Sequence, residues 1–131
     1  MARVTGIGGL FVASPDPEAL NRWYGEHFGI VMLNSSEYDD EGWFQDRGET
    51  VFTAVQGEGG MLDPGNRWML NLRIDDLDAM VAELRGAGIE VEPHAEEYPN
   101  GRFAELRDPD GNQVQLWEPN AESVARDPER G

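Results

Sequence analysis

The sequence predicts a single α+β domain in which two tandem βαβββ units form paired curved sheets around a cleft. Three observations support this fold class. A strand-like stretch followed by a helix-like stretch occurs twice, in residues 4–56 and again in residues 66–119. Each helix-like stretch begins after an aspartate and ends at a glycine. A glycine-rich linker over residues 57–65 separates the two copies.

The first unit opens with an apolar stretch, residues 7–13, which we expect to form a strand. Asp16 then caps a helix, Pro17 suits its first position, and Gly29 ends it. Apolar side chains recur at helical spacing at Leu20, Trp23, Tyr24 and Phe28. Further strands are predicted at residues 30–33, 43–45 and 51–55, with an acidic, solvated loop around residues 37–41.

The second unit repeats this order. Residues 68–74 alternate as a strand, Asp76 opens a helix, and Gly86 and Gly88 end it. Strands are predicted at residues 89–91, 102–106 and 113–117, and the last two are joined by the tight-turn sequence of residues 108–112. Gly48 precedes Val51 by the same spacing that separates Gly111 from Val114, which relates the two units. Residues 120–131 form a polar tail that we expect to fray.

Composition and charge exclude several classes of partner. The 131 residues, 39% hydrophobic and 27% charged, are typical of one globular domain. A formal net charge of −16 repels phosphate backbones, and no apolar run reaches the roughly 18 residues of a membrane span. We therefore expect neither nucleic acid nor membrane as a partner. The chain has no cysteine, which fits a cytoplasmic location and excludes thiolate metal ligands.

The helix openings and the closing turn resemble the vicinal oxygen chelate superfamily, which includes glyoxalases, bleomycin-resistance proteins and extradiol dioxygenases. The similar segments are residues 16–20, 23–24, 28–30, 75–78, 86–89, 107–112 and 116–119, so the resemblance covers roughly residues 4–119. It implies the repeated βαβββ unit, a small-molecule ligand and a homodimer. It does not imply one chemistry, because one fold hosts many functions.

The metal-using members of this superfamily draw one ligand from each of four positions. By spacing from the helix openings and the turns, those positions are Gly9, Phe52, Met69 and Gln115 in this chain. Glycine and phenylalanine offer no ligand atom, and a thioether is unsuited to hard divalent ions. A single glutamine oxygen does not hold a metal. We therefore expect no metal and no other cofactor.

Strand alternation predicts which side chains line the cleft. If Leu70, Leu72 and Ile74 pack on the helices, their neighbours along the strand face the other way. The predicted ligand-binding residues are Phe11, Phe52, Met69, Asn71, Arg73, Gln115 and Trp117. This mostly apolar set with a few polar groups is typical of small-molecule pockets. Arg73 is either an anchor for an acidic ligand group or the partner of an acid such as Glu105.

These observations favour a metal-independent protein that binds an apolar or aromatic small molecule. Two enzymatic alternatives stay open: a glyoxalase-type metal-dependent lyase or dioxygenase, and a metal-free isomerase using Tyr24, Glu105 or His94 as acid or base. His27, at the end of the first helix, suits the negative end of the helix dipole instead. The sequence does not identify catalytic residues, and it leaves open whether the two units pair within one chain or between two.

Overall fold

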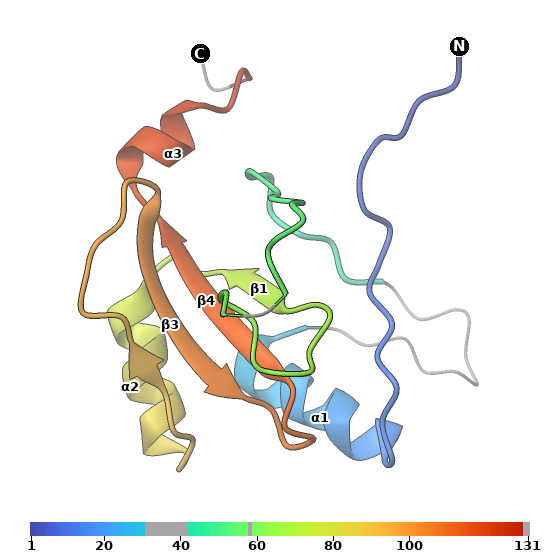
Figure 1. The fold of residues 1–131 in the computed structure, drawn as a ribbon, viewed down its shortest axis with the longest axis vertical. Coiled ribbons are helices and arrows are strands. Elements are labelled where there is room, and N and C mark those ends of the chain that lie inside the picture. The colour runs from blue at the N-terminus through green and yellow to red at the C-terminus, as the bar shows by residue number, and fades with distance from the viewer. Residues whose placement is uncertain (31–41, 58, 130–131) are drawn as a thin grey trace.

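The computed structural model describes residues 1–30, 42–57 and 59–129. Its elements are the helices α1 (Pro17–Phe28), α2 (Leu77–Gly86) and α3 (Ala121–Ala125), and the strands β1 (Leu70–Arg73), β2 (Glu92–Pro93), β3 (Gly101–Arg107) and β4 (Gln113–Pro119). Figure 1 shows the helices and the single sheet that they accompany. The predicted α+β class is confirmed.

The second unit has the predicted βαβββ order. Its strands form one sheet in the order β1-β4-β3-β2, in which β1 is parallel to β4 and the other neighbours are antiparallel. The parallel pair is possible because α2 carries the chain back across the sheet between β1 and β2. The β3–β4 hairpin pairs seven residues on each strand, from Gly101 opposite Pro119 to Arg107 opposite Gln113. It is therefore the longest ladder in the sheet.

The predicted helix boundaries of both units are confirmed. The Asp16 carboxylate accepts a hydrogen bond from the Ala19 amide at 3.2 Å, and Asp76 does the same for Ala79 at 3.1 Å. These bonds satisfy amides that have no partner inside the first turn. Gly29 ends α1 in the left-handed region, at φ 67°, which a side chain would disfavour.

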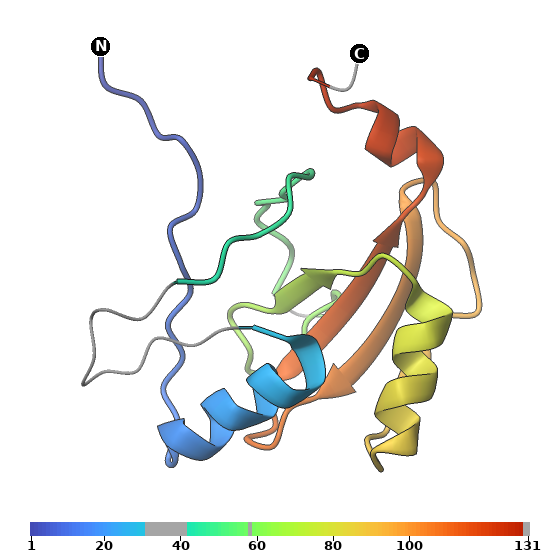
Figure 2. The same ribbon diagram turned by 180° about the vertical axis from the view of Figure 1, so that it is seen from behind.

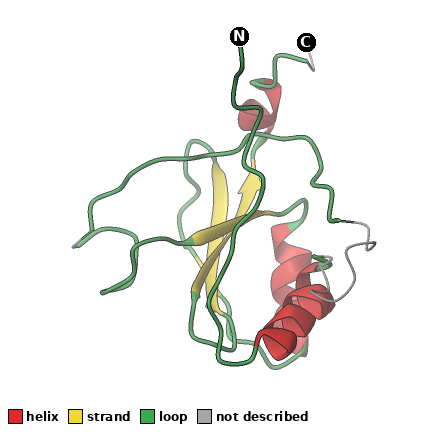
Figure 3. Cartoon of the chain, turned by 90° about the vertical axis from the view of Figure 1, so that its right-hand side faces the viewer, coloured by secondary structure: helices red, strands yellow, loops and turns green. Residues whose placement is uncertain are grey.

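The core lies between the two long helices and one face of the sheet. From the sheet, Ala104, Leu106, Val114 and Leu116 are between 0% and 3% exposed. The helices and their flanks contribute buried residues to the same cluster, namely Leu20, Tyr24, Ile74, Leu77, Val81, Leu84 and Val91. Figure 3 shows α1 and α2 on the same side of the sheet, with long loops on the other side. The sheet thus has one helix-covered face and one face without helices.

The structure corrects the prediction of strands in the first unit. Residues 7–13, 43–45 and 51–55 contain no paired strand, and most of the strand expected at 30–33, like the acidic loop, lies outside the described residues. Figures 1 and 2 draw the N-terminal segment apart from the four-stranded sheet. The apolar side chains of these segments are exposed: 95% for Phe11, 89% for Phe52 and 55% for Ile7. A strand needs a neighbour for its main-chain groups, and none of the described residues of this chain provides one.

Because only the helix of the first unit recurs in the described residues, the division of the chain into two equivalent units stays a prediction.

The C-terminal tail also differs from expectation. Instead of fraying at residue 120, the chain forms α3, whose first turn is capped by the Asn120 side chain at 2.9 Å from the Ser123 amide. The Arg47 guanidinium binds Asp127 through two hydrogen bonds of 2.8 and 2.7 Å, which holds the segment after α3. No helix in the described part of the chain is long and apolar enough to cross a membrane.

The turn between β3 and β4 is organised by one buried carboxylate. Asp108, 5% exposed, accepts hydrogen bonds from the amides of Asp110 and Asn112, both at 2.9 Å, and from Asn112 Nδ2 at 2.8 Å. A fourth bond, 2.7 Å long, comes from the Tyr24 hydroxyl on α1. Burial, and then the hydrogen bond to Asp108, raise the pKa of the Tyr24 hydroxyl well above its ordinary value. The bond therefore joins α1 to the hairpin throughout the physiological pH range.

We predict that Tyr24→Phe lowers the free energy of unfolding by about 1.5 kcal/mol at pH 7, because it removes a buried hydrogen bond to a charged acceptor. In the wild type, both states keep the phenolic proton below pH 10.0, the ordinary pKa of tyrosine. Above that pH the unfolded state loses the proton first, so stability falls as the pH rises. The Phe variant should lack this contribution. Urea unfolding between pH 7 and pH 11 measures both effects.

Tyr98→Phe is the matched control, because Tyr98 is 37% exposed and lies outside the core cluster. Its unfolding free energy should change by less than about 0.5 kcal/mol. A Tyr24→Phe protein as stable as the wild type at pH 7 would show that the hydroxyl contributes nothing to the fold.

Candidate functional site

The sheet face opposite the helices carries the candidate site, and we call it the open face. Pairing places Asn71, Gln115 and Glu105 beside one another on β1, β4 and β3. The next row consists of Arg73, Trp117 and Phe103. Alternation along a strand sends these side chains away from the core residues Val114 and Leu116. Four of the residues predicted from sequence, Asn71, Arg73, Gln115 and Trp117, therefore share this face.

Two amides meet at the middle of the open face. Asn71 Nδ2 donates a hydrogen bond of 2.8 Å to Gln115 Oε1. Gln115 is 4% exposed, whereas Asn71 lies at the solvent-accessible side of the pair. The strand pairing puts Asn71, and not Met69, opposite Gln115.

Beside the amides lies a group of aromatic rings. Phe103 and Trp117 are stacked with their centroids 6.4 Å apart and their planes 9° from parallel. Trp117 is 4% exposed, and its Nε1 donates to the Asn100 carbonyl at 2.9 Å. Tyr98 contacts Phe103 edge-on at 5.6 Å, and the His94 ring lies 6.0 Å from Phe103. Phe103 is the more exposed ring of the stacked pair, so it is the ring on which a flat apolar group could stack.

A chain of polar side chains borders the aromatic group on β3 and β4. His94 Nε2 lies 3.1 Å from Glu105 Oε2, and Gln113 Nε2 donates to Glu105 Oε1 at 2.9 Å. Gln113 also binds the 59–65 segment, since its Oε1 accepts from the Asp63 amide at 2.7 Å and its Nε2 donates to the Met61 carbonyl at 2.9 Å. Gln113 thus fixes the linker against the edge of the open face.

Sequence reasoning named Glu105 and His94 but missed Gln113 and Phe103 as members of this face. The tight-turn sequence at residues 108–112 could have predicted that both residues lie on this face. A hairpin closed there pairs Phe103 with Trp117 and Arg107 with Gln113, so that each pair lies on one face.

Arg73 has partners other than the two suggested by the sequence. Its two terminal nitrogens donate to main-chain carbonyls, NH1 to Glu49 at 2.7 Å and NH2 to Asp46 at 2.6 Å. Gly48 lies so close that a Cβ on it would be 2.5 Å from Arg73 Cζ. Arg73 therefore holds the 46–49 segment against the sheet, and its terminal nitrogens are already bonded.

The strand pairing that defines the open face does not include the remaining predicted cleft residues. Phe11 and Phe52 are 95% and 89% exposed, and Met69 precedes β1. Of the other candidates, Tyr24 lies in the core with its proton held by burial and Asp108. His27 lies in the last turn of α1 against Trp23, with ring centroids 5.3 Å apart.

The residues at the family's four metal positions do not fit a metal ion. Gly9 and Phe52 lack donor atoms, and the Gln115 oxygen accepts a hydrogen bond from Asn71. The described residues contain no group of three histidine, cysteine or carboxylate side chains placed to hold a metal. The donor atoms at this face are neutral amides and the His94–Glu105 pair, whose imidazole and carboxylate are hydrogen-bonded to each other.

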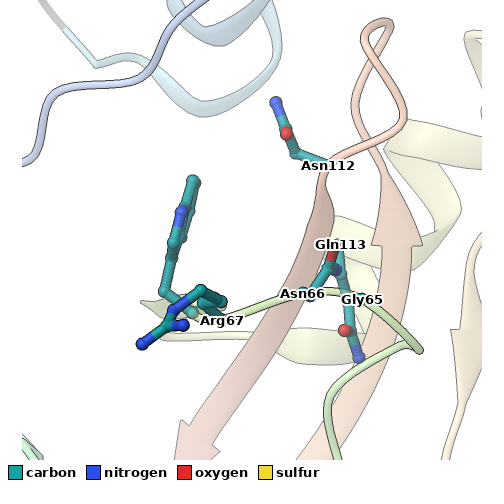
Figure 4. Close-up of a pocket in the computed structure, with 6 residues that line it drawn as sticks. Gly65, Asn66, Arg67, Asn112 and Gln113 are labelled. Atoms are coloured by element: carbon teal, nitrogen blue, oxygen red, sulfur yellow. The ribbon is translucent and has the colours of Figure 1, made fainter.

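A pocket of about 270 Å³ lies where the linker reaches the start of β4. Figure 4 shows the side chains around it, which come from the 65–68 segment and from the beginning of β4. Its lining residues are Gly65, Asn66, Arg67, Trp68, Asn112 and Gln113. It shares Gln113 with the polar chain and is therefore an extension of the open face.

Comparison with known proteins identifies the class. Residues 9–117 match the model of a glyoxalase-like domain. The chain belongs to the glyoxalase-like family of the vicinal oxygen chelate superfamily, as its sequence resemblance predicts. No curated protein matches it significantly.

Three solved structures are similar to most of this chain. TnmS3, an antibiotic binding protein from Streptomyces sp. CB03234, is 27% identical with a TM-score of 0.61, over 92% of this chain and 100% of that one. A putative glyoxalase family protein from Bacillus anthracis is 20% identical with a TM-score of 0.59, over 92% and 99%. A lactoylglutathione lyase from Agrobacterium tumefaciens is 22% identical with a TM-score of 0.54, over 88% and 95%. The last two show the fold alone.

We predict that Arg73→Met releases the 46–49 segment, because it removes both hydrogen bonds to the carbonyls of that segment. Trypsin should cleave after Arg47 about fivefold faster than in the wild type, since cleavage follows local opening. The initial rate of appearance of the cleaved fragment, followed by mass spectrometry, measures this. Arg67→Met, at an exposed arginine of the linker, should leave the rate unchanged. Equal rates in wild type and Arg73→Met would show that Arg73 does not hold the segment.

Proposed function

We propose that this chain is a metal-independent binding protein for an apolar or aromatic small molecule, and that the ligand lies on the open face. The observation that carries the proposal is the stacked pair Phe103 and Trp117 beside the Asn71–Gln115 amides. Flat apolar rings next to a few polar groups are the usual composition of a small-molecule site. The antibiotic binding protein TnmS3, similar over nearly all of both chains, supports the same kind of function.

Metal independence is supported by the donor set at the family's ligand positions. Gln115 stands where a metal-using relative requires a charged or imidazole ligand, and its oxygen is engaged in a hydrogen bond from Asn71. Binding would then rest on stacking and hydrogen bonds alone. A cytoplasmic location is part of the proposal, supported by the absence of cysteine.

We propose further that a second copy of the chain completes the cleft. Phe11 and Phe52, predicted to line it, are almost fully exposed in one chain. The segments that carry them have strand-like alternation but no strand partner within the described residues. Among the described strands, none pairs with the outer edge of β1, so this edge offers main-chain groups to an incoming strand. Pairing between two chains would cover the exposed rings and give these segments a strand partner. Of the two arrangements that the sequence leaves open, we therefore propose that the units pair between two chains.

One observation favours an acid–base enzyme as the second candidate. His94 and Glu105 are 3.1 Å apart at the border of the aromatic group, which is the spacing of a base and the carboxylate that orients it. Chemical conversion of a bound compound, lost in His94→Gln while binding is kept, would establish this alternative. A compound recovered unchanged supports binding alone.

We predict that flat aromatic compounds raise the melting temperature by about 5 to 10 °C at a hundredfold excess over their Kd. Excess EDTA should leave this shift unchanged, because no metal takes part. Phe103→Leu should weaken binding about two- to tenfold by removing one ring of the stacked pair. Phe28→Leu, on the helix-covered side, is the control and should leave affinity unchanged. Stoichiometric metal in the purified protein, with binding lost in EDTA, would overturn metal independence.

We predict a dimer of about 29 kDa by light scattering, twice the 14.6 kDa of one chain. Phe52→Asp should weaken dimerisation at least tenfold, because it places a charge in an apolar contact. Ala82→Asp adds the same charge on the exposed side of α2 and should leave the dimer intact. A wild-type monomer at micromolar concentration would exclude a cleft completed by a second copy.

A further inference from the structure

The Asn71–Gln115 pair leaves several hydrogen-bonding groups unused. The single bond between the two side chains uses one of the two N–H groups of Asn71 Nδ2 and one lone pair of Gln115 Oε1. Asn71 Oδ1 and Gln115 Nε2 have no partner among the described residues. Exchanging nitrogen and oxygen in both amides again leaves one amide oxygen and one amino group without a partner. The pair therefore presents a donor and an acceptor to the open face whichever way its amides are turned.

The unpaired amide nitrogen of Gln115 affects ligand affinity because it is largely buried. Gln115 is 4% exposed, yet no fully buried side-chain nitrogen or oxygen in the described residues lacks a partner, so its Nε2 keeps a small contact with solvent. A ligand that stacks on Phe103, which belongs to the next row of the sheet together with Trp117, would displace this water. Removing a polar group from water without replacing its hydrogen bond costs about 1–3 kcal/mol. The ligand must therefore replace the bonds or bind weakly.

The charges near the amides decide which ligand can do so. A carboxylate offers only acceptors, so it would meet the free acceptor Asn71 Oδ1 without a proton to give. Glu105 lies next to Gln115 in the same row and adds a negative charge. The terminal nitrogens of Arg73, the cation in the neighbouring row, are bonded to the carbonyls of Asp46 and Glu49. An anionic group thus meets an unpaired amide oxygen and a neighbouring carboxylate here, and its nearest cation, Arg73, is already bonded.

We infer that the open face selects neutral aromatic ligands that carry a carbonyl next to an N–H or O–H group, and rejects the corresponding carboxylates. In such a ligand, the carbonyl accepts from Gln115 and the N–H or O–H donates to Asn71, while the ring stacks on Phe103 and Trp117. The inference rests on the proposed function and specifies its ligand class.

Isothermal titration calorimetry with four naphthalene compounds tests it on the full-length wild-type protein. Naphthalene measures stacking alone, 2-acetylnaphthalene adds an acceptor, 2-naphthamide adds an acceptor and a donor, and 2-naphthoate carries the anion. We expect 2-naphthamide to bind about tenfold more tightly than naphthalene, 2-acetylnaphthalene to lie between them, and 2-naphthoate to be the weakest.

Gln115→Met keeps much of the side-chain volume and removes the amide. In this variant, the tenfold advantage of 2-naphthamide should fall to about twofold or less, while naphthalene itself binds as before. Asn71→Leu, at an exposed position, gives the same test if Gln115→Met melts at a lower temperature than the wild type. A naphthoate as tight as the naphthamide, or an amide advantage that survives both substitutions, would overturn the inference. Binding of none of the four compounds would instead contradict the proposed function.

Discussion

The carboxylate of Asp108 accepts four hydrogen bonds, three from its own turn and one from the Tyr24 hydroxyl of α1. A buried carboxylate is tolerated only where its lone pairs are occupied in this way. The turn bonds set where β3 ends and β4 begins, and hence which residues of β4 face the helices and which lie on the open face. The bond from α1 ties the first unit's helix to the second unit's hairpin. Both the core and the site therefore depend on one side chain that belongs to neither.

The parts of the fold that follow from short-range signals could be predicted from the sequence. Asp16 and Asp76 cap their helices because a carboxylate at that point satisfies a free amide, and Gly29 ends α1 because it adopts a left-handed conformation. The strands of the first unit could not be settled in this way. Alternation shows that residues 7–13 and 51–55 suit a strand, but whether they pair depends on a partner that sequence pattern does not specify. The short α3 was missed because its five residues carry little apolar pattern and its main signal is the cap at Asn120.

The candidate site shows the same division. Alternation placed Asn71, Arg73, Gln115 and Trp117 on one face, since it needs only the direction of each strand. It could not foresee that Asn71 and Gln115 bind each other, or that Arg73 reaches the carbonyls of residues 46 and 49. Those contacts depend on which strands are neighbours and on the path of a segment without regular structure. Phe103 could have been included by extending the hairpin pairing through the 108–112 turn, whereas the linker contacts of Gln113 had no signal in the sequence.

The close approach of Gly48 to Arg73 has a consequence for how this sequence can change. A Cβ at position 48 would lie 2.5 Å from the arginine Cζ, so any larger residue there collides with the guanidinium while Arg73 keeps its present conformation. Once position 73 holds a shorter side chain, the three atoms nearest to a Cβ at position 48 are gone. The two substitutions are therefore epistatic, and the path that changes residue 73 first is the accessible one. A substitution at position 48 alone would therefore move the Arg73 guanidinium and cost its two hydrogen bonds to the 46–49 segment, and only paired libraries would show that this cost arises at residue 73.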